Sequence, residues 1–349
     1  MGATDEVEGP IDVGEKLEEI VDFVRGVDRD NDPYDLIVTR EGEEAEDDDS
    51  NHTTYEFKRA KTVGNLPEKL GSFAEDKIET KQQAVADESK EVVKYAAANI
   101  SSQSDYVQHV LADDVPRFEQ YQDLLTTEEF EQIDYIDEDG EGPEFQVILI
   151  RDGTEDRALV FQDITRREIL GRDGKIRFWS DDDHYTDVNK TIVEVPNRID
   201  AVYYDGHIFI FDQRRFEKIF DYMDEFNEVA EDTVEEIVDS EVPIHTDDVF
   251  LDAVTSYPNA TRIFYAVRER ALWEHEDVNM DTFDYIVDEF DLSIEIEERD
   301  GEEGIVLEDK RNVWEVIHLY NDDHLSSPIT EVGYQVGKKD ARTGEAGEG

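Results

Sequence analysis

Cysteine is absent from this sequence of 349 residues. Its absence excludes disulfide bonds, thiolate zinc sites, cysteine-held iron–sulfur clusters and a cysteine nucleophile. The longest apolar runs are short, such as Phe145–Ile150, and none approaches the roughly 18 residues that cross a bilayer. The first residues carry neither the basic nor the apolar segment of a signal peptide. We therefore expect a cytoplasmic protein.

Basic residues are scarce: 34 Lys and Arg stand against 93 Asp and Glu, so the formal net charge is −59. The imbalance is not confined to a tail. Residues 1–190 hold 51 acidic and 21 basic residues, and residues 191–349 hold 42 and 13. The acidic charge therefore covers the whole surface, while 10% aromatic residues argue against a disordered chain.

An evenly acidic surface with few lysines is typical of proteins that work in molar salt. Carboxylates retain water and hydrated cations, and their mutual repulsion is screened because the Debye length is about 3 Å at 1 M salt. We interpret the protein as halophilic. The alternative is an acidic protein that binds partners in ordinary salt.

The first 140 residues are predicted to be rich in helix. Apolar residues spaced three and four apart predict a helix over 15–27, and weaker patterns of the same kind extend over 67–100 and 102–136. Alternating residues predict two paired strands at 36–39 and 53–58. We expect this region to combine helices with a short β-hairpin.

The second part of the chain mixes strands and helices. Strands are predicted at 145–150, 157–161, 175–179 and 192–195, and the dipeptide Asp205-Gly206 predicts a hairpin between strands 199–204 and 207–211. Asp212 is a candidate N-cap for one helix that runs to residue 237. Helices are also predicted at 247–255, 259–273, 281–290 and 311–320, with a hairpin around Asp300-Gly301. The fold class is α+β.

Motifs of the common enzyme classes are missing. None of the eight histidines has HxH, HxxxH or HExxH spacing, so a mononuclear zinc site is not expected. The chain also lacks GxSxG, GxxxxGK[ST] and GxGxxG. We assign no catalytic residue, no metal and no cofactor from the sequence.

One spacing keeps an enzymatic alternative open. Glu308-Asp309-Lys310 follows a predicted strand and several acidic residues. Restriction-type nucleases use a Glu-x-Lys beside a further carboxylate to hold Mg²⁺ and steady the attacking water. In a chain with 93 carboxylates such a spacing also arises by chance. The alternative is thus a metal-dependent nuclease centred on Glu308 and Lys310.

The few basic residues form clusters, several at predicted helix starts where free backbone N–H groups also favour phosphate. A chain that has shed most of its basic charge retains these residues, which indicates contacts with a ligand. Internal ion pairing with neighbouring carboxylates is the equally weighted alternative. If DNA is the ligand, the candidate binding residues are Arg214, Arg215, Lys218, Arg262, Lys310, Arg311, Lys338 and Lys339.

Two segments resemble the KwaB family of the Kiwa anti-phage defence system. One is the run 201–220, a hairpin followed by the helix motif Phe216-Glu217-Lys218-Ile219-Phe220; the other is the run 316–330 with Tyr334 and Lys338. The resemblance covers roughly residues 140–339 and is clearest over 195–339. We accordingly divide the chain into a helix-rich region 1–140, a KwaB-like domain 141–339 and a flexible tail 340–349.

The resemblance implies a cytoplasmic DNA-binding effector without an established catalytic centre. It further implies homodimerisation and a membrane-embedded partner, KwaA, that recruits the protein to the inner face of the membrane. The third possibility is a non-catalytic scaffold that contacts only protein. The acidic surface departs from a basic DNA groove, so DNA contacts would have to be short-range at molar salt.

The even acidic charge generates a prediction about salt. We expect the folded state to be lost below a few tenths molar KCl, because carboxylate repulsion is then unscreened. Thermal unfolding followed by circular dichroism across a KCl series measures this. A cooperative transition in low salt at the same temperature as in about 3 M KCl would contradict the halophilic interpretation.

Overall fold

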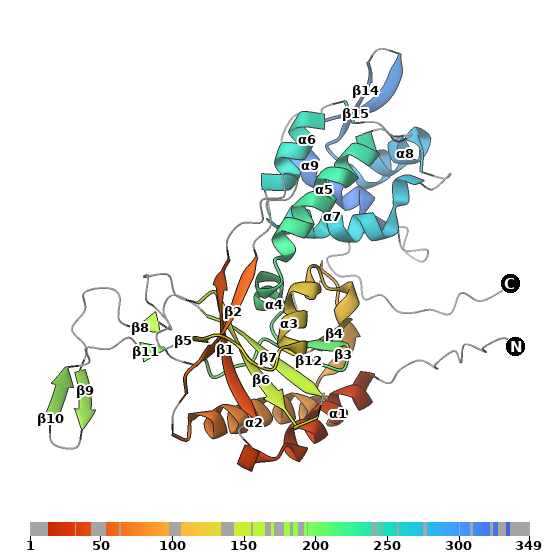
Figure 1. The fold of residues 1–349 in the computed structure, drawn as a ribbon. Helices are drawn as coiled ribbons and strands as arrows, with labels where there is room; N and C mark the ends of the chain where they lie inside the picture. The colour runs from red at the N-terminus through yellow and green to blue at the C-terminus, as the bar shows by residue number, and fades with distance from the viewer. Residues whose placement is uncertain are drawn as a thin grey trace, which may run out of the picture. The chain divides into compact units, whose positions relative to one another are not determined.

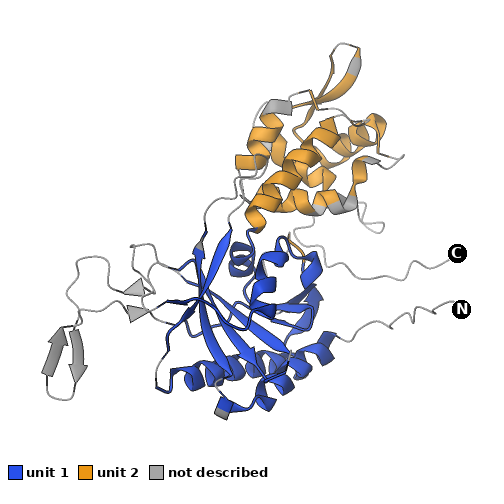
Figure 2. Cartoon of the chain, viewed as in Figure 1, with its two compact units in different colours: residues 1–95, 102–221 blue, residues 96–101, 222–349 orange. Residues whose placement is uncertain are grey.

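The computed structural model describes residues 13–335 with internal gaps. The gaps are 32, 43–53, 63, 98–105, 134–142, 155, 165–168, 171–177, 182–183, 188–191, 194, 239, 241, 243, 246, 257, 275–277, 300, 308–309, 322–323 and 327–332. The chain forms two compact units, which Figure 2 colours separately. Unit 1 comprises residues 1–95 and 102–221, and unit 2 comprises residues 96–101 and 222–349.

Unit 1 is built on a nine-stranded sheet with the order β3-β4-β13-β12-β7-β6-β1-β2-β5 (Figure 1). Neighbours are antiparallel except for the parallel pairs β3–β4 and β2–β5 at the two edges. The strands are β1 (Tyr34–Glu41), β2 (Tyr55–Ala60), β3 (Glu91–Lys94), β4 (Tyr106–Leu111), β5 (Gln132–Ile133), β6 (Phe145–Arg151), β7 (Arg157–Asp163), β12 (Ala201–Tyr204) and β13 (His207–Ile210). Strands from both sides of residue 140 therefore share one sheet.

Two helices, α1 (Val13–Gly26) and α2 (Leu66–Ala86), lie along one face of the sheet (Figure 1). The predicted helix 15–27 is confirmed as α1, whose residues Leu17, Ile20, Val21 and Val24 are buried. They join a core with alternate residues of β1, β6, β7 and β12. Burial of each large aliphatic side chain contributes roughly 1.5–3 kcal/mol, so this face supplies much of the stability of unit 1.

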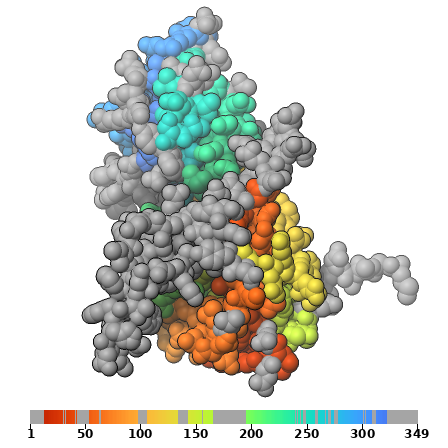
Figure 3. Space-filling model, turned by 60° about the vertical axis from the view of Figure 1, so that its left-hand side comes forward, coloured from red at the N-terminus to blue at the C-terminus, as the bar shows by residue number. Residues whose placement is uncertain are grey.

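The opposite face of the sheet carries an aromatic cluster around Tyr121, between a short 3₁₀ helix (Phe118–Tyr121) and α3 (Gln122–Thr126). The Tyr121 ring centroid lies 5.7 Å from that of Phe161 and 4.7 Å from that of Phe220. Its hydroxyl donates to the carbonyl of Ile219, the last residue of α4 (Gln213–Ile219). Phe57 of β2 also contacts Tyr121, and the orange and yellow surfaces of these segments adjoin in Figure 3.

The helices predicted over 67–100 and 102–136 are only partly correct. Helix α2 ends at Ala86, and residues 91–94 and 106–111 are the strands β3 and β4. Val107 and Val110 lie three apart, as on a helix, yet β4 pairs with β13 on one side and β3 on the other. Pairing with strands remote in the sequence overrode the local pattern, since strand propensity depends strongly on context.

The helix predicted from Asp212 to residue 237 is divided. Helix α4 ends at Ile219, and α5 (Tyr222–Val238) begins after Asp221, whose φ of 51° is left-handed. No proline or glycine marks this break. It occurs where Phe220, 1% exposed, enters the aromatic cluster and Asp221 accepts a hydrogen bond from Tyr55.

The hairpin predicted at Asp205-Gly206 is confirmed. Strands β12 and β13 pair in antiparallel register, with Tyr204 opposite His207. Both turn residues have positive φ, 47° and 78°, as a type I′ turn requires. This turn ends β12 and sets the register that brings β13 to the start of α4.

Unit 2 packs helices around one apolar core. Its helices are α5, α6 (Asp247–Ser256), α7 (Pro258–Arg270), α8 (Met280–Phe290) and α9 (Lys310–Tyr320), close to the predicted ranges. The predicted hairpin is present as β14 (Glu295–Arg299) and β15 (Glu302–Val306), which protrudes from the helices (Figure 1). Phe250, Phe264 and Ile317 are fully buried, so the helices bury their apolar stripes against one another.

Three further two-stranded sheets are present. They are β8 (Ile169–Leu170) with β11 (Ile192–Val193), β9 (Phe178–Asp181) with β10 (His184–Asp187), and β16 (His324–Ser326) with β17 (Gly333–Gln335). Within the part of the chain that the structure describes, we find no helix with the length and apolar content needed to span a bilayer. The α+β class predicted from the sequence is confirmed.

Helix α2 approaches the sheet closely at Gly71. A Cβ atom on Gly71 would lie 2.2 Å from Cζ of the Tyr34 ring, which is itself 2% exposed. No real Cβ contact is that short, so the ring or the helix would have to move. The absence of a side chain at residue 71 is therefore what allows α2 to rest on β1.

We predict that Gly71→Ala destabilises the protein by about 1–3 kcal/mol, the usual cost of overpacking a core. Gly26→Ala is the matched control, because nothing lies within 4 Å of a Cβ atom there. It should leave stability unchanged or raise it by up to about 1 kcal/mol. Denaturant unfolding in constant high salt compares the two variants. Equal free energies of unfolding for the two variants would show that the Tyr34 ring can move aside without destabilising the protein.

Candidate functional site at the charged edge of the sheet

Helix α4 starts directly after β13, and Asp212 caps it by accepting from the backbone N–H of Arg215 at 3.3 Å. The N-cap predicted at Asp212 is confirmed. The helix carries three candidate DNA-binding residues, Arg214, Arg215 and Lys218. Because a rigid hairpin precedes it, the position of each relative to the sheet edge is well defined.

Two of these three cations form ion pairs with a buried carboxylate of the sheet. Arg215 Nη1 lies 2.8 Å from Asp163 Oδ2, and Lys218 Nζ lies 2.5 Å from Asp163 Oδ1. Asp163 ends β7 and its side chain is only 6% exposed. For Arg215 and Lys218 the structure therefore shows the internal ion pairing that the sequence left open.

A second carboxylate, Asp200, lies behind this pair and is completely buried. Its Oδ2 accepts the backbone N–H of Asp163 at 2.7 Å, and its Oδ1 lies 3.2 Å from Nε of Arg198. Burial raises the pKa of Asp200 to about 7, against the opposing effect of that N–H, Arg198 and Arg215. The free-energy cost of desolvating the ionised carboxylate exceeds the stabilisation that its partners provide.

Arg214 has a different environment from its neighbours on α4. Its side chain is exposed, and among the described residues we find no hydrogen bond or ion pair to it. Helix α4 thus carries one cation, Arg214, that faces solvent, and two cations, Arg215 and Lys218, that pair with Asp163 at the end of β7. Only the first presents its guanidinium to a ligand without breaking an internal contact.

The other candidate DNA-binding residues belong to unit 2 or lie outside the description. Arg262 on α7 is half-buried, with its guanidinium 5.8 Å from the centre of the Phe226 ring. Lys310 and Arg311 occupy the first turn of α9, but their side chains are outside the described part. Lys338, Lys339 and the nuclease candidate Glu308 also lie outside the described residues. Their predicted roles remain predictions.

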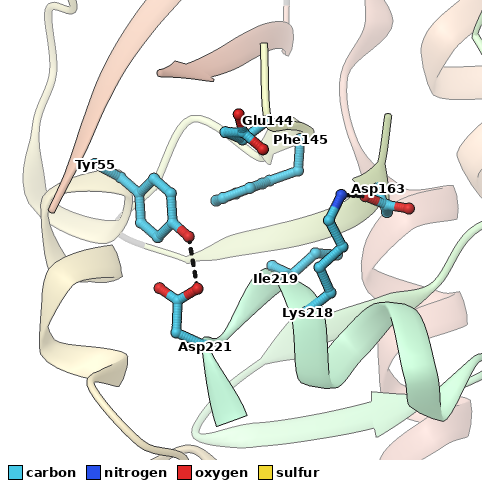
Figure 4. A pocket seen from close by; sticks show the side chains of 7 residues that line it. All are labelled: Tyr55, Glu144, Phe145, Asp163, Lys218, Ile219 and Asp221. Carbon is cyan, nitrogen blue, oxygen red and sulfur yellow. Dashed lines mark hydrogen bonds and ion pairs between the residues drawn. The ribbon is translucent and has the colours of Figure 1, made fainter. Parts of the chain in front are cut away.

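A pocket of about 200 Å³ opens beside Lys218 (Figure 4). It lies at the edge of the sheet where β7 ends and β2 and β6 begin, so that residues distant in sequence meet there. The Tyr55 hydroxyl donates to Asp221 Oδ1 at 2.9 Å across one side of the pocket. Its lining residues are Tyr55, Glu144, Phe145, Asp163, Lys218, Ile219 and Asp221.

Sequence reasoning missed the carboxylates of this edge. Asp163 is the last residue of the apolar strand β7, and Asp200 directly precedes β12. Each position at the end of a strand indicates a partly buried carboxylate. Among 93 acidic residues this signal is weak. No sequence feature marks Asp221, because its role depends on a helix break that the local pattern does not show.

A second titratable pair lies between β4 and β13. Nε2 of His109 is 2.9 Å from Nδ1 of His207, and the two rings stack. Burial, and next the neighbouring His207, lower the pKa of His109 to about 4, so His109 is neutral at pH 7. Burial also lowers the pKa of His207. In the described ranges no group of three or more His, Asp or Glu residues could hold a metal ion.

The arrangement defines a protein that orders charged side chains at one edge of a sheet and carries no recognised catalytic motif. Comparison with protein families finds a match to Kiwa protein KwaB-like over residues 143–330. This match covers more than half of the 349 residues. The chain belongs to the KwaB-like family of the Kiwa anti-phage defence system. No curated protein and no solved structure matches it.

The matched segment contains most of the charged edge. Asp163, Asp200, Arg215, Lys218 and the start of β6 all fall within 143–330, and the match reaches from β6 through α9. Strands β1 to β5 and helices α1 and α2 precede the matched segment in the chain. The five strands nevertheless belong to the same sheet as β6, β7, β12 and β13. The predicted bounds of the KwaB-like domain, 141–339, remain a prediction.

The raised pKa of Asp200 predicts a pH dependence of stability. Between pH 4 and 7 the folded protein holds a proton on Asp200 that the unfolded chain has released. This contribution to stability is therefore lost as pH rises through about 7, with a slope of up to about 1.4 kcal/mol per pH unit. Asp200→Asn should remove it while keeping an acceptor for the Asp163 N–H.

Denaturant unfolding at pH 5, 6, 7 and 8 in constant salt measures this difference. We expect the stability of wild type relative to Asp200→Asn to fall from pH 5 to about pH 7 and to level off towards pH 8, where the folded protein has also released the proton. Asp113→Asn, at an exposed position, controls for the loss of one negative charge. Parallel profiles for wild type and Asp200→Asn would show that Asp200 is ionised throughout.

Proposed function

We propose that this chain is a DNA-binding effector of Kiwa defence that acts together with a membrane-embedded, KwaA-like partner. The observation that carries the proposal is the family match over residues 143–330. Recruitment to the inner face of the membrane and homodimerisation belong to the same proposal. Family membership supports the role in defence. The contacts with DNA and with the partner are the part of the proposal that experiments have to test.

The charge of the chain constrains how DNA would be bound. A net charge of −59 repels a polyanion at long range, so binding requires salt that screens this repulsion. Contacts then depend on individual cations within hydrogen-bond distance of phosphates. Arg214 suits this role because its guanidinium is exposed next to a rigid hairpin.

Arg215 and Lys218 contribute to the proposal in another way. Their ion pairs with Asp163 hold α4 on the sheet edge and so fix the direction in which Arg214 projects. Removing Arg215 would leave the buried carboxylate of Asp163 with one cation fewer. We therefore assign Arg214 to DNA contact, and Arg215 and Lys218 to positioning.

The test compares Arg214→Glu with Lys69→Glu, which makes the same charge change at an exposed position of α2. We predict about tenfold weaker DNA retention for Arg214→Glu, as for loss of one charge-assisted phosphate contact. Phage protection in cells should fall with it, while Lys69→Glu retains both. Gel retardation in molar KCl and melting temperature are the measurements.

Arg215→Glu separates positioning from contact. It should destabilise the fold by about 1–3 kcal/mol, because it leaves Asp163 underpaired and adds a repelling charge.

Parallel incubation of plasmid with Mg²⁺ reports any cleavage, the outcome that the nuclease alternative requires. Undiminished DNA retention and protection by folded Arg214→Glu would favour a scaffold that contacts only protein.

A further inference from the structure

Half of the lysines of this chain, seven of fourteen, fall within residues 58–94. Three of them converge: Lys77 and Lys81 lie on α2, and Lys90 ends the turn that leads into β3. The charges of Lys77 and Lys90 both act on Lys81. In a chain with a net charge of −59, three lysines around one point are a local exception that needs a physical explanation.

Lys81 lacks the carboxylate partner that most described cations of unit 1 have. Arg25, for example, lies 2.5 Å from Glu79. For Lys81 we find no ion pair with any residue that the structure describes; its Nζ lies instead 5.4 Å from the centre of the Phe211 ring. An aromatic face attracts an ammonium group but brings no net negative charge to neutralise it. An exposed cation is compensated by solvent ions, whereas Lys81 is half-buried.

The local structure holds these ammonium groups in place. Lys77 lies one turn before Lys81 on the same side of α2, and its Nζ is 5.8 Å from the centre of the Phe73 ring. That ring and the ring beneath Lys81 both pack against the core of unit 1. The turn after α2 folds back on the helix, because the backbone N–H of Lys90 donates to the carbonyl of Ala84 at 2.9 Å. The three lysines are thus positioned by packed rings and by the main chain.

The convergence of like charges is unfavourable for the fold. Lysines four residues apart on a helix repel each other. Burial, and after it the charge of Lys90, lower the pKa of Lys81; Asp212 opposes this shift and Lys77 adds to it. The surroundings of Lys81 therefore disfavour its charged form, which is the opposite of what an internal ion pair does. Groups whose placement costs stability in this way are typical of ligand sites.

Two carboxylates close to this cluster are already engaged. Asp212 caps α4: its Oδ1 accepts the backbone N–H of Arg215 at 3.3 Å, and its Oδ2 lies 3.3 Å from Nε of the same residue. Asp76 lies 3.3 Å from Nζ of its neighbour Lys77. The ammonium of Lys81 is therefore left to an acceptor from outside the chain.

A phosphate group meets these requirements. Its oxygens accept several charge-assisted hydrogen bonds at once, and lysines bind phosphates as point charges. We propose that Lys77, Lys81 and Lys90 bind a phosphate group, with the ammonium of Lys81 at the centre. The phosphate comes either from a nucleic-acid backbone or from a free phosphorylated compound.

The three lysines precede the segment 143–330 of the family match. The proposal thus gives α2 and the turn after it a role besides covering the sheet, and it does not depend on the DNA contact assigned to Arg214. Because a chain of net charge −59 repels anions at long range, any binding of a phosphate has to be local.

The first experiment is calorimetric titration of the full chain with inorganic pyrophosphate in constant molar KCl. We expect Lys81→Gln, which keeps a polar side chain without the charge, to bind pyrophosphate about tenfold more weakly than wild type. Lys77→Gln should weaken binding in the same direction, and Lys81→Arg should retain it. Lys69→Gln, at an exposed position of the same helix, controls for the general loss of one positive charge.

The second experiment tests the nucleic-acid source. Fluorescence anisotropy measures the affinity of the same variants for a DNA duplex across a KCl series. Loss of one phosphate contact reduces the slope of log affinity against log salt by about 0.9. We expect this reduction in Lys81→Gln and not in Lys69→Gln if the phosphate belongs to DNA.

Thermal unfolding distinguishes a ligand-binding lysine from a merely structural one. Without phosphate, Lys81→Gln should melt at the same temperature as wild type or higher, because it removes a repulsion. A lysine that serves only to pack on Phe211 would instead lower the melting temperature when replaced. If the phosphate is a free compound, pyrophosphate should raise the melting temperature of wild type and not that of Lys81→Gln, since only a bound ligand stabilises the folded state.

The outcomes separate the possibilities. A smaller DNA slope in Lys81→Gln assigns the phosphate to nucleic acid, whereas a loss confined to pyrophosphate assigns it to a free compound. The proposal is overturned if wild type binds neither probe, if Lys69→Gln loses as much as Lys81→Gln, or if Lys81→Gln melts lower without phosphate. Absence of DNA binding alone, with pyrophosphate still bound, would count against the DNA-binding function and leave this site standing.

Discussion

The carboxylate of Asp163 joins the sheet of unit 1 to the helix that follows it. It ends β7, lies next to Asp200 at the start of β12, and receives Arg215 and Lys218 from α4. A buried carboxylate without such partners would be strongly unfavourable. Each of these four residues therefore requires the others, and together they set where α4, Arg214 and the pocket lie.

The shortage of cations gives each one more structural weight than in an ordinary protein. Arg59 and Arg151 both pair with the buried Asp35, and Arg157 contacts the carbonyl groups of Leu124 and Thr127. Retained arginines in this chain thus serve the interior as well as the surface. A cluster of basic residues in a highly acidic sequence is consequently a weaker sign of ligand contact than its rarity suggests.

Several features followed from local sequence alone. The apolar stripe of α1 and the Asp205-Gly206 hairpin were both predictable, because a helix period and a type I′ turn are properties of neighbouring residues. The α+β class and the resemblance to the KwaB-like family rest on the same kind of local pattern. The aromatic runs in 201–220 carried that resemblance through the hairpin and into α4.

Tertiary structure decided the rest. Residues 106–111 became β4 because β13, almost a hundred residues later, offers hydrogen-bonding partners that a helix would forgo. The helix divides at Asp221 because Tyr121 packs against Phe220 and Tyr55 donates a hydrogen bond to Asp221, both from other parts of the fold. Likewise, only the folded sheet brings Asp163 beside Arg215 and Lys218. The sequence determined which residues are charged and which segments are amphipathic, whereas contacts between distant segments decided which charges are paired inside and which face solvent.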